Sequence, residues 1–159
     1  MQPTPVYRVL VGMDMSNDAA AALNWAAGEA DARAGELIIV HAFEHFAIGT
    51  DPWTSEDSAL QDKVREAERR DIDGRIAEVL PDMAALPTQR TYVEDLPARA
   101  LTAGAATADL LVIGAHGDRL SDRAGLGSTP RTCLQYPLCP VVVISAARFP
   151  ARRPAPVLS

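Results

Sequence analysis

Residues 109–117 read Asp-Leu-Leu-Val-Ile-Gly-Ala-His-Gly, and this stretch decides the fold class. Its run of consecutive apolar residues, 110–113, is typical of a strand that is buried on both faces. Gly114 and Gly117 follow this strand at once, and glycine allows the backbone to approach a neighbouring group closely. Apolar strands of this kind belong to parallel sheets that helices cover on both sides.

The segments on either side repeat the pattern of a strand followed by a helix. Strands are predicted at 6–13, 36–44, 88–93, 109–114 and 139–144. Helices are predicted to begin near Ser16 and Thr54, and two more to span 96–107 and 130–136. With right-handed crossovers, this order predicts an α/β fold: an open, doubly wound, five-stranded parallel sheet of order 3-2-1-4-5 with helices on both faces.

The helix that begins near Thr54 has both an apolar stripe and a run of charges. The charge run at 62–73 is expected to be its solvated face. Six apolar residues at helical spacing are expected to face the core: Leu60, Val64, Ala67, Ile72, Ile76 and Val79.

Length and charge exclude several classes of protein. The 159 residues suit one domain, predicted at 1–145, followed by a tail at 146–159 that is expected to be mobile. Fifteen basic residues against 21 acidic ones give a net charge of −6, which disfavours nucleic acid and an anionic membrane surface as partners. No apolar run is long enough to span a bilayer and no signal peptide is recognisable, so we expect a cytoplasmic protein.

The cysteines and histidines do not predict a metal site. Cys133 and Cys139 lack the Cys-x-x-Cys spacing of a zinc site and are interpreted as core thiols. His41 and His45 stand four residues apart on a strand and the following loop, where their side chains do not converge. The phosphate-binding motif Gly-x4-Gly-Lys-Ser/Thr is absent, which excludes Walker-type chemistry.

Three short segments are predicted to meet at one edge of the sheet. In an open α/β sheet, ligands bind beyond the carboxyl ends of the strands, where the winding reverses. Residues 12–14 follow the first strand and residues 114–117 follow the fourth. Residues 127–129 begin the last helix, whose free amides and dipole favour an anion. The residues alone therefore predict a phosphate cradle that faces the carboxylate of Asp14.

These segments resemble the universal stress proteins, and among them the subgroup that binds ATP. The signature of that subgroup, Gly-x2-Gly-x9-Gly-Ser/Thr, is matched at 114, 117, 127 and 128. Residues 10–16 and 139–144 resemble the family's first strand and turn and its last strand, so the likeness extends from Tyr7 to Ser145. The resemblance implies an adenine-nucleotide alpha-hydrolase-like fold and a regulatory role in the stress response.

The resemblance also implies a role for each matching residue. Asp14 would contact the adenosine, the backbone of Ala42 would meet the adenine, the turn at 114–117 would hold ribose and phosphate, and 127–129 would hold the triphosphate of ATP, with or without Mg²⁺. Pro130 is a departure, because it lacks the N–H and the hydroxyl of the Ser or Thr common there. The candidate binding residues are Gly12, Met13, Asp14, Ala42, Gly114, Ala115, His116, Gly117, Gly127, Ser128 and Thr129.

Several alternatives stay open at this point. Asp14 alone is also typical of a helix cap. A smaller ligand, cyclic AMP or AMP, fits the loss of a phosphate contact at Pro130. A dimeric interaction module with a vestigial pocket would need no ligand. An ATP-dependent enzyme is the weakest alternative, because His116 has no triad partners and no general base is recognisable, so slow hydrolysis of ATP is the most that we expect.

The last strand also predicts a partner. In the order 3-2-1-4-5 it lies at an edge of the sheet, and residues 140–144, Pro-Val-Val-Val-Ile, carry no charge. A long apolar edge strand left unpaired promotes aggregation. Antiparallel pairing with a second copy across a two-fold axis would satisfy it. Homodimers of this kind are common among the universal stress proteins, so the resemblance favours the same arrangement.

Overall fold

The computed structural model describes residues 2–44, 55–82, 84–117 and 125–147. These residues form one sheet of five parallel strands in the order β3-β2-β1-β4-β5, which confirms the predicted fold class. The predicted mobile tail lies outside the described residues from 148 onward, as does His45. The elements are β1 (Arg8–Gly12), α1 (Asn17–Ala32), β2 (Glu36–Phe43), α2 (Ser55–Val79), β3 (Thr88–Glu94), α3 (Pro97–Ala105), β4 (Leu110–Gly114), α4 (Ser128–Gln135) and β5 (Val141–Ile144).

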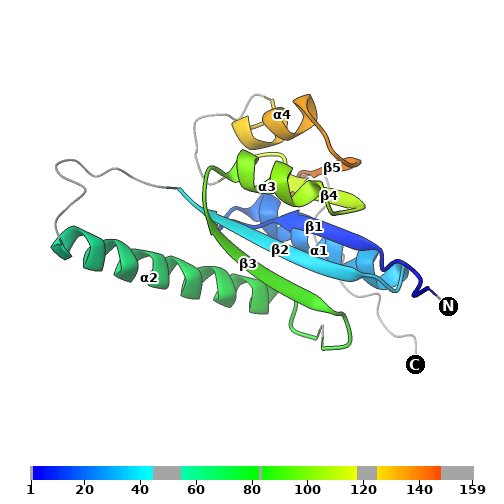
Figure 1. Cartoon of the computed structure of the whole chain (residues 1–159), viewed down its shortest axis with the longest axis horizontal. Coiled ribbons are helices and arrows are strands. Elements are labelled where there is room, and N and C mark those ends of the chain that lie inside the picture. The colour runs from blue at the N-terminus through cyan, green and yellow to red at the C-terminus, as the bar shows by residue number, and fades with distance from the viewer. Residues whose placement is uncertain (1, 45–54, 83, 118–124, 148–159) are drawn as a thin grey trace.

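Helices cover the two faces of the sheet in pairs. α1 and α2 lie on one face and α3 and α4 on the other (Figure 1). The pleat of β1 divides its side chains between them: Val9 and Val11 pack with α1, whereas Leu10 packs with Leu101 of α3. Cys133 of α4 is buried in this second cluster, and burial raises the pKa of its thiol, as suits a core position.

Alanines bring α1 close to the middle of the sheet. Ala22, Ala26 and Ala30 are fully buried against the strands, since a methyl group keeps the helix near the backbone beneath it. Ser16 is the N-cap residue of α1, and its hydroxyl accepts a hydrogen bond from the amide of Ala19 at 3.1 Å. The alternative in which Asp14 caps this helix is therefore wrong.

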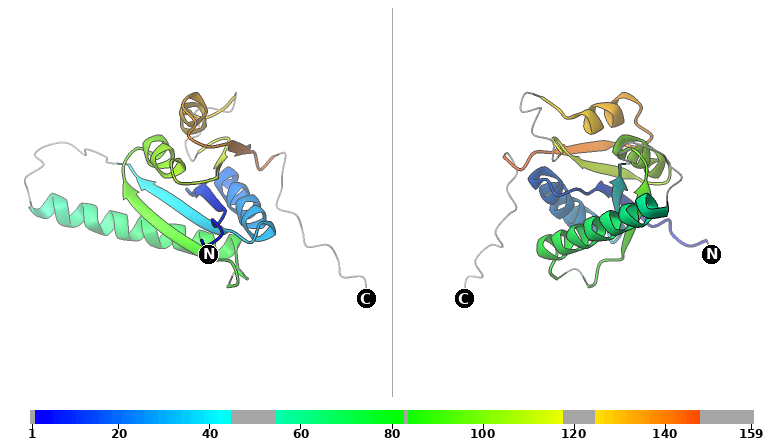
Figure 2. Two further views of the ribbon diagram at one scale, coloured as in Figure 1. Left: turned by 45° about the vertical axis from the view of Figure 1, so that its right-hand side comes forward. Right: turned by 90° about the vertical axis from the view of Figure 1, so that its left-hand side faces the viewer.

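The apolar stripe predicted for α2 is correct only over its second half. Ile72 and Ile76 are buried as expected, but Leu60 and Val64 are 60% and 56% exposed, and Ala67 is exposed as well. The first half of α2 extends past the ends of the strands (Figures 1 and 2), so no sheet lies beneath it. Helical spacing identifies which residues share a face, but not how far the opposing surface reaches.

Charged side chains join α2 to the edge strand β3, so the run at 62–73 is not simply a solvated face. Arg90 donates to Asp73 at 2.9 Å, and the hydroxyl of Tyr92 donates to the same carboxylate oxygen. Arg69 lies over the ring of Tyr92, 4.7 Å from its centre. Burial, together with the bond to Asp73, raises the pKa of Tyr92 to about 12. Burial alone would raise the pKa of the Asp73 carboxyl. The hydrogen bonds from Tyr92 and Arg90 outweigh burial, so the pKa is lowered.

Candidate nucleotide site

A cavity of about 450 Å³ opens beyond the carboxyl ends of β1, β2 and β4, a volume suited to a small-molecule ligand. Ala115 lies just behind its wall: it is buried, its N–H donates to Ile144 and its carbonyl accepts from Gly127. The other ten candidate binding residues all line the cavity: Gly12, Met13, Asp14, Ala42, Gly114, His116, Gly117, Gly127, Ser128 and Thr129.

Asp14 is held in place by the residue that caps α1. One of its carboxylate oxygens accepts from the backbone N–H of Ser16 at 2.9 Å and from the Ser16 hydroxyl at 2.5 Å. Its other oxygen faces Gly117, where an added Cβ would lie 3.2 Å from it. The carboxylate after β1 and the turn after β4 are therefore opposite walls of one cavity, as the sequence predicts.

The four glycines of the candidate site have two different tasks. A Cβ on Gly12 would lie 2.9 Å from Leu101, and one on Gly114 would lie 2.9 Å from the backbone of Asp18 and Ala19. These two glycines allow helices α3 and α1 to pack on the strand ends. A Cβ on Gly117 or Gly127 would have ordinary or slightly short spacing to the described residues, and none of these atoms would lie closer than 3.2 Å. Only this second pair leaves space toward the cavity.

Asp18, in the first turn of α1, supports the site by holding His116 in place, a role that the sequence analysis missed. One oxygen accepts from the backbone N–H of His116 at 3.1 Å and lies 2.9 Å from Nδ1 of the same residue. The other accepts from the N–H of Ala146 at 2.8 Å. The Nε2 of His116 lies 2.5 Å from the carbonyl oxygen of Gly125. Hydrogen bonds within the protein therefore fix the position of His116. In the sequence, the one hint of its partner was that Asp18 is an acidic residue near the start of a predicted helix.

The backbone donors of the cradle are partly used within the protein. The N–H groups of His116 and Gly127 bond to Asp18 and Ala115, and Pro130 has none. α4 begins at Ser128, and no side chain among the described residues caps it. Ser128 and Thr129 of its first turn line the cavity, where the helix dipole favours an anion.

His41 lines the cavity, although the sequence analysis gave it no role there. It lies on β2, and its ring reaches across to the turn after β1 and down to α2. Nδ1 is 2.7 Å from the carbonyl oxygen of Met13, and Nε2 is 2.7 Å from a carboxylate oxygen of Glu68, which also lines the cavity. Its partners are 28 and 27 residues away in the chain, so no local pattern could identify them.

No group of three or more His, Cys, Asp or Glu side chains that could hold a metal ion occurs among the described residues. None of the helices in the described part of the chain combines the length and the apolar composition that a membrane span requires.

Known proteins share both the sequence pattern and the fold. Universal stress protein Rv2005c of Mycobacterium tuberculosis is 37% identical over 145 residues, which cover 89% of this chain and 46% of that protein. Universal stress protein UspA from Lactobacillus plantarum superposes with a TM-score of 0.73 at 20% identity, covering 89% of this chain and 99% of that one. A universal stress protein in complex with cAMP gives a TM-score of 0.59 at 27% identity, with coverage of 89% and 98%.

The family assignment follows from the extent of these matches. The chain spans about half the length of the curated relatives it matches. Within this chain, a model of the universal stress protein family matches residues 6–145. This range includes all of the strands and helices described above, together with the cavity between them. The chain belongs to the universal stress protein family.

Proposed function

We propose that this chain binds an adenine nucleotide in the cavity beyond β1 and β4 and acts as a regulatory stress-response protein rather than as a dedicated catalyst. The observation that carries the proposal is the meeting of Asp14 with the glycine turn: a Cβ on Gly117 would lie 3.2 Å from the Asp14 carboxylate. The relative that was solved with cAMP supports an adenine nucleotide as the class of ligand. Asp14 would contact the adenosine, and the turn and the start of α4 would hold phosphate.

ATP, with or without Mg²⁺, is the ligand that the motif favours, and a monophosphate is the second candidate. Three features support the smaller ligand. Pro130 lines the cavity without an N–H to offer. The N–H of His116 and that of Gly127 already have protein acceptors. The carboxylate of Asp14 lines the cavity, whereas no Lys or Arg does among the described residues. Such a lining favours a ligand of low negative charge.

Mass spectrometry of the small molecules released from the purified protein would identify the ligand. Calorimetric titration with ATP, AMP and cyclic AMP would then rank their affinities. We expect an adenine nucleotide in the released material and measurable binding of at least one of the three. If all three titrations showed no binding, the cavity would be vestigial and the chain an interaction module.

Replacing Asp14 by alanine should lower the affinities for ATP, ADP and AMP by similar factors of about tenfold. The lost hydrogen bond would be to the adenosine that all three nucleotides share. Asp14→Asn is the matched variant, since it keeps one acceptor oxygen and the same shape. Calorimetry with each nucleotide, with and without Mg²⁺, measures the effect. A loss confined to ATP with Mg²⁺ would place Asp14 near a metal ion instead.

Replacing Pro130 by serine should improve ATP binding more than cyclic AMP or AMP binding. The substitution restores an N–H and adds a hydroxyl in the first turn of α4, beside the other cavity residues of that turn. One charge-assisted hydrogen bond corresponds to roughly tenfold in affinity. Pro130→Ala distinguishes the effect of the N–H from that of the hydroxyl, since alanine restores only the N–H. An unchanged ratio of the ATP and AMP affinities would mean that this position lies beyond the reach of phosphate.

We also propose a homodimer built on β5. This strand lies at the edge of the sheet, its residues Val141–Val143 are only partly buried, and the segment before it exposes Tyr136 and Leu138. The double variant Val142→Lys with Val143→Glu should therefore give monomers that keep their nucleotide affinity. Size-exclusion chromatography with light scattering measures this, and circular dichroism checks the fold. A wild-type chain that is monomeric at micromolar concentration would exclude the dimer.

A further inference from the structure

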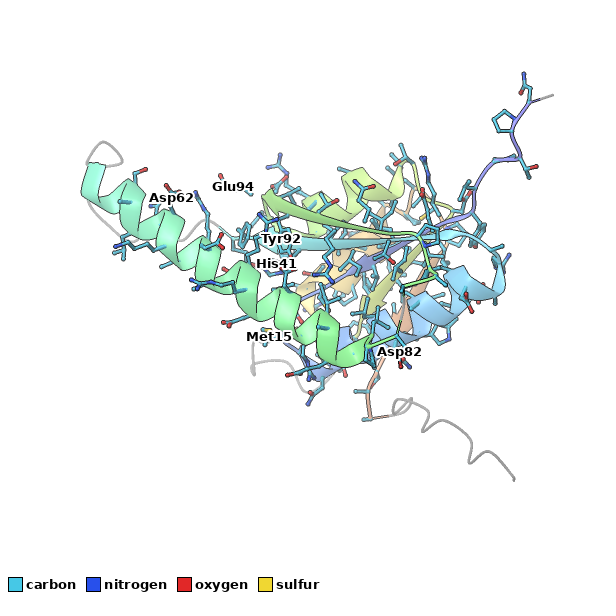
Figure 3. The ribbon with its side chains drawn as sticks, turned by 90° about the horizontal axis from the view of Figure 1, so that it is seen from below. Met15, His41, Asp62, Asp82, Tyr92 and Glu94 are labelled. Carbon is cyan, nitrogen blue, oxygen red and sulfur yellow. The ribbon has the colours of Figure 1, made fainter. Side chains whose placement is uncertain are left out.

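His41 is the only polar or charged side chain that is buried among the described residues, with 6% of its surface exposed. Its ring packs edge-on against Phe43, 5.1 Å between centres, and against Tyr92, 6.2 Å between centres. Figure 3 shows His41 and Tyr92 between the sheet and α2. A buried polar side chain must have its hydrogen bonds satisfied, so the identity of its two partners fixes its protonation state.

Both partners of the His41 ring are acceptors. The carbonyl oxygen of Met13 can only accept, so Nδ1 must carry a proton. The carboxylate of Glu68 also accepts when it is ionised, so Nε2 must carry a second proton, unless the carboxyl group is itself protonated. The arrangement therefore holds one proton more than a neutral imidazole beside a carboxylate.

The extra proton belongs to the imidazole. Imidazole is the stronger base of the two groups. The Glu68 side chain is 42% exposed and keeps much of its hydration as a carboxylate, whereas the imidazolium has two charge-assisted or dipolar acceptors within 2.7 Å. We infer that His41 is an imidazolium held between the Met13 carbonyl and Glu68, and that it positions the turn that carries Asp14.

The positioning acts through the peptide groups of Met13. Its N–H donates to the carbonyl of Val40 at 2.8 Å, and its carbonyl accepts from His41, so both sides of this residue are tied to β2. Asp14 is the next residue along the chain. Glu68 brings α2 into the same assembly, and both His41 and Glu68 line the cavity. This role rests on the proposed nucleotide site, whereas the protonation state of His41 does not.

Deprotonation of His41 would leave a lone pair of Nε2 facing a carboxylate, which would push Glu68 away and loosen the turn. Nucleotide affinity should therefore be higher in mildly acidic solution, where His41 keeps its second proton, than in mildly alkaline solution.

The elements packed around His41 carry further titratable or charged groups. α2 contributes Glu68, with Arg65, Arg69 and Asp73 engaged on β3; β3 contributes Tyr92 and Glu94; the cavity contributes Asp14 and Glu44. The second histidine of the cavity, His116, is paired with Asp18. Because it would add its own pH dependence, the test must isolate His41.

The variant Glu68→Gln isolates the His41 pair. A glutamine amide can donate to Nε2, so a neutral His41 with its proton on Nδ1 would keep both hydrogen bonds without the charge. Glu66→Gln is the matched control, because Glu66 is exposed on the same helix and does not line the cavity. Calorimetric titrations would use cyclic AMP, whose phosphodiester keeps one charge across the range tested.

We expect cyclic AMP affinity to fall by about fivefold or more from mildly acidic to mildly alkaline solution in the wild-type chain and in Glu66→Gln. Glu68→Gln should lose most of that fall and keep only what His116 contributes. Parallel pH profiles for the wild-type chain and Glu68→Gln would overturn the positioning role.

Nitrogen NMR of the wild-type chain tests the protonation state separately. His45→Gln and His116→Gln variants assign the His41 signals, since the chain has three histidines. We expect two protonated ring nitrogens in mildly acidic solution, and a single proton on Nδ1 in Glu68→Gln under the same conditions. A neutral ring in the wild-type chain would overturn the inference. If no nucleotide binds at all, the proposed function fails, while the NMR result still decides the ion pair.

Discussion

Replacing Gly114 by alanine should lower the free energy of unfolding by about 3 kcal/mol, the upper part of the range for overpacked sites. The new Cβ would lie 2.9 Å from the backbone nitrogen of Ala19 and 2.9 Å from the carbonyl carbon of Asp18. These are backbone atoms of the first turn of α1, which cannot rotate aside as a side chain can. The helix must move off β4, and the hydrogen bonds of Asp18 to His116 and Ala146 would be disturbed with it.

Denaturant unfolding followed by circular dichroism measures this loss. Gly28→Ala is the matched control, because Gly28 lies within α1 and an added Cβ there would meet nothing within 4 Å. That variant should gain about 0.5–1 kcal/mol from the better helix propensity of alanine. An unfolding midpoint for Gly114→Ala equal to that of the wild-type chain would contradict the close packing of α1 on β4.

Replacing Gly117 by alanine should affect binding rather than stability, in contrast to Gly114→Ala. We expect an unchanged free energy of unfolding and a nucleotide affinity lower by at least about tenfold, which corresponds to about 1.4 kcal/mol of binding free energy. Gly117 is not among the described residues with positive φ, so its backbone accepts a Cβ without strain. Among the described residues, that Cβ would come within 4 Å of the Asp14 carboxylate alone, at 3.2 Å. The methyl group would therefore push Asp14 aside and fill the space between the two walls of the cavity.

Calorimetric titration with the nucleotide that the wild-type chain releases would measure the loss. Gly127→Ala should weaken binding for the same reason, because it lines the cavity and its Cβ would have ordinary spacing to the protein. The Gly28→Ala variant should bind as the wild-type chain does. Wild-type affinity in both Gly117→Ala and Gly127→Ala would remove the glycine cradle from the proposed site.

Sequence patterns sufficed for the sheet because its strands are short apolar runs with clear boundaries. The run at 110–113, for example, is β4 to within one residue at each end. They did not suffice for α2. Leu60 and Val64 continue the same helical stripe as Ile72, but they are exposed because the strands end before the helix does. The extent of a surface is set by another part of the chain, and periodicity within one helix carries no information about it.

The candidate site was predictable where a residue acts through its own backbone, and not where it acts through a distant partner. The glycines and Asp14 stand directly after strands, and the topology alone brings them together. The motif could not show that its glycines have different roles. Gly114 allows α1 to pack closely on β4, whereas Gly117 leaves space in the cavity. Asp18 and Glu68 were missed because their hydrogen bonds reach residues 98 and 27 positions away.

The hydrogen bonds of Asp18 also bear on how the chain folds. One carboxylate, 13% exposed, joins the first helix to the residues that follow β4 and β5. Closing loops of this length costs entropy before any contact is gained, so we expect the bond to Ala146 to form only once β5 has joined the sheet. Once this bond has formed, detaching β5 from the sheet requires more free energy than breaking the contacts of β5 alone. The Asp18 carboxylate would lose the N–H of Ala146 as a donor at the same time. We therefore expect the edge strand and the first helix to open as one cooperative unit, and exchange of the β5 amides that face β4 should approach the rate set by global unfolding.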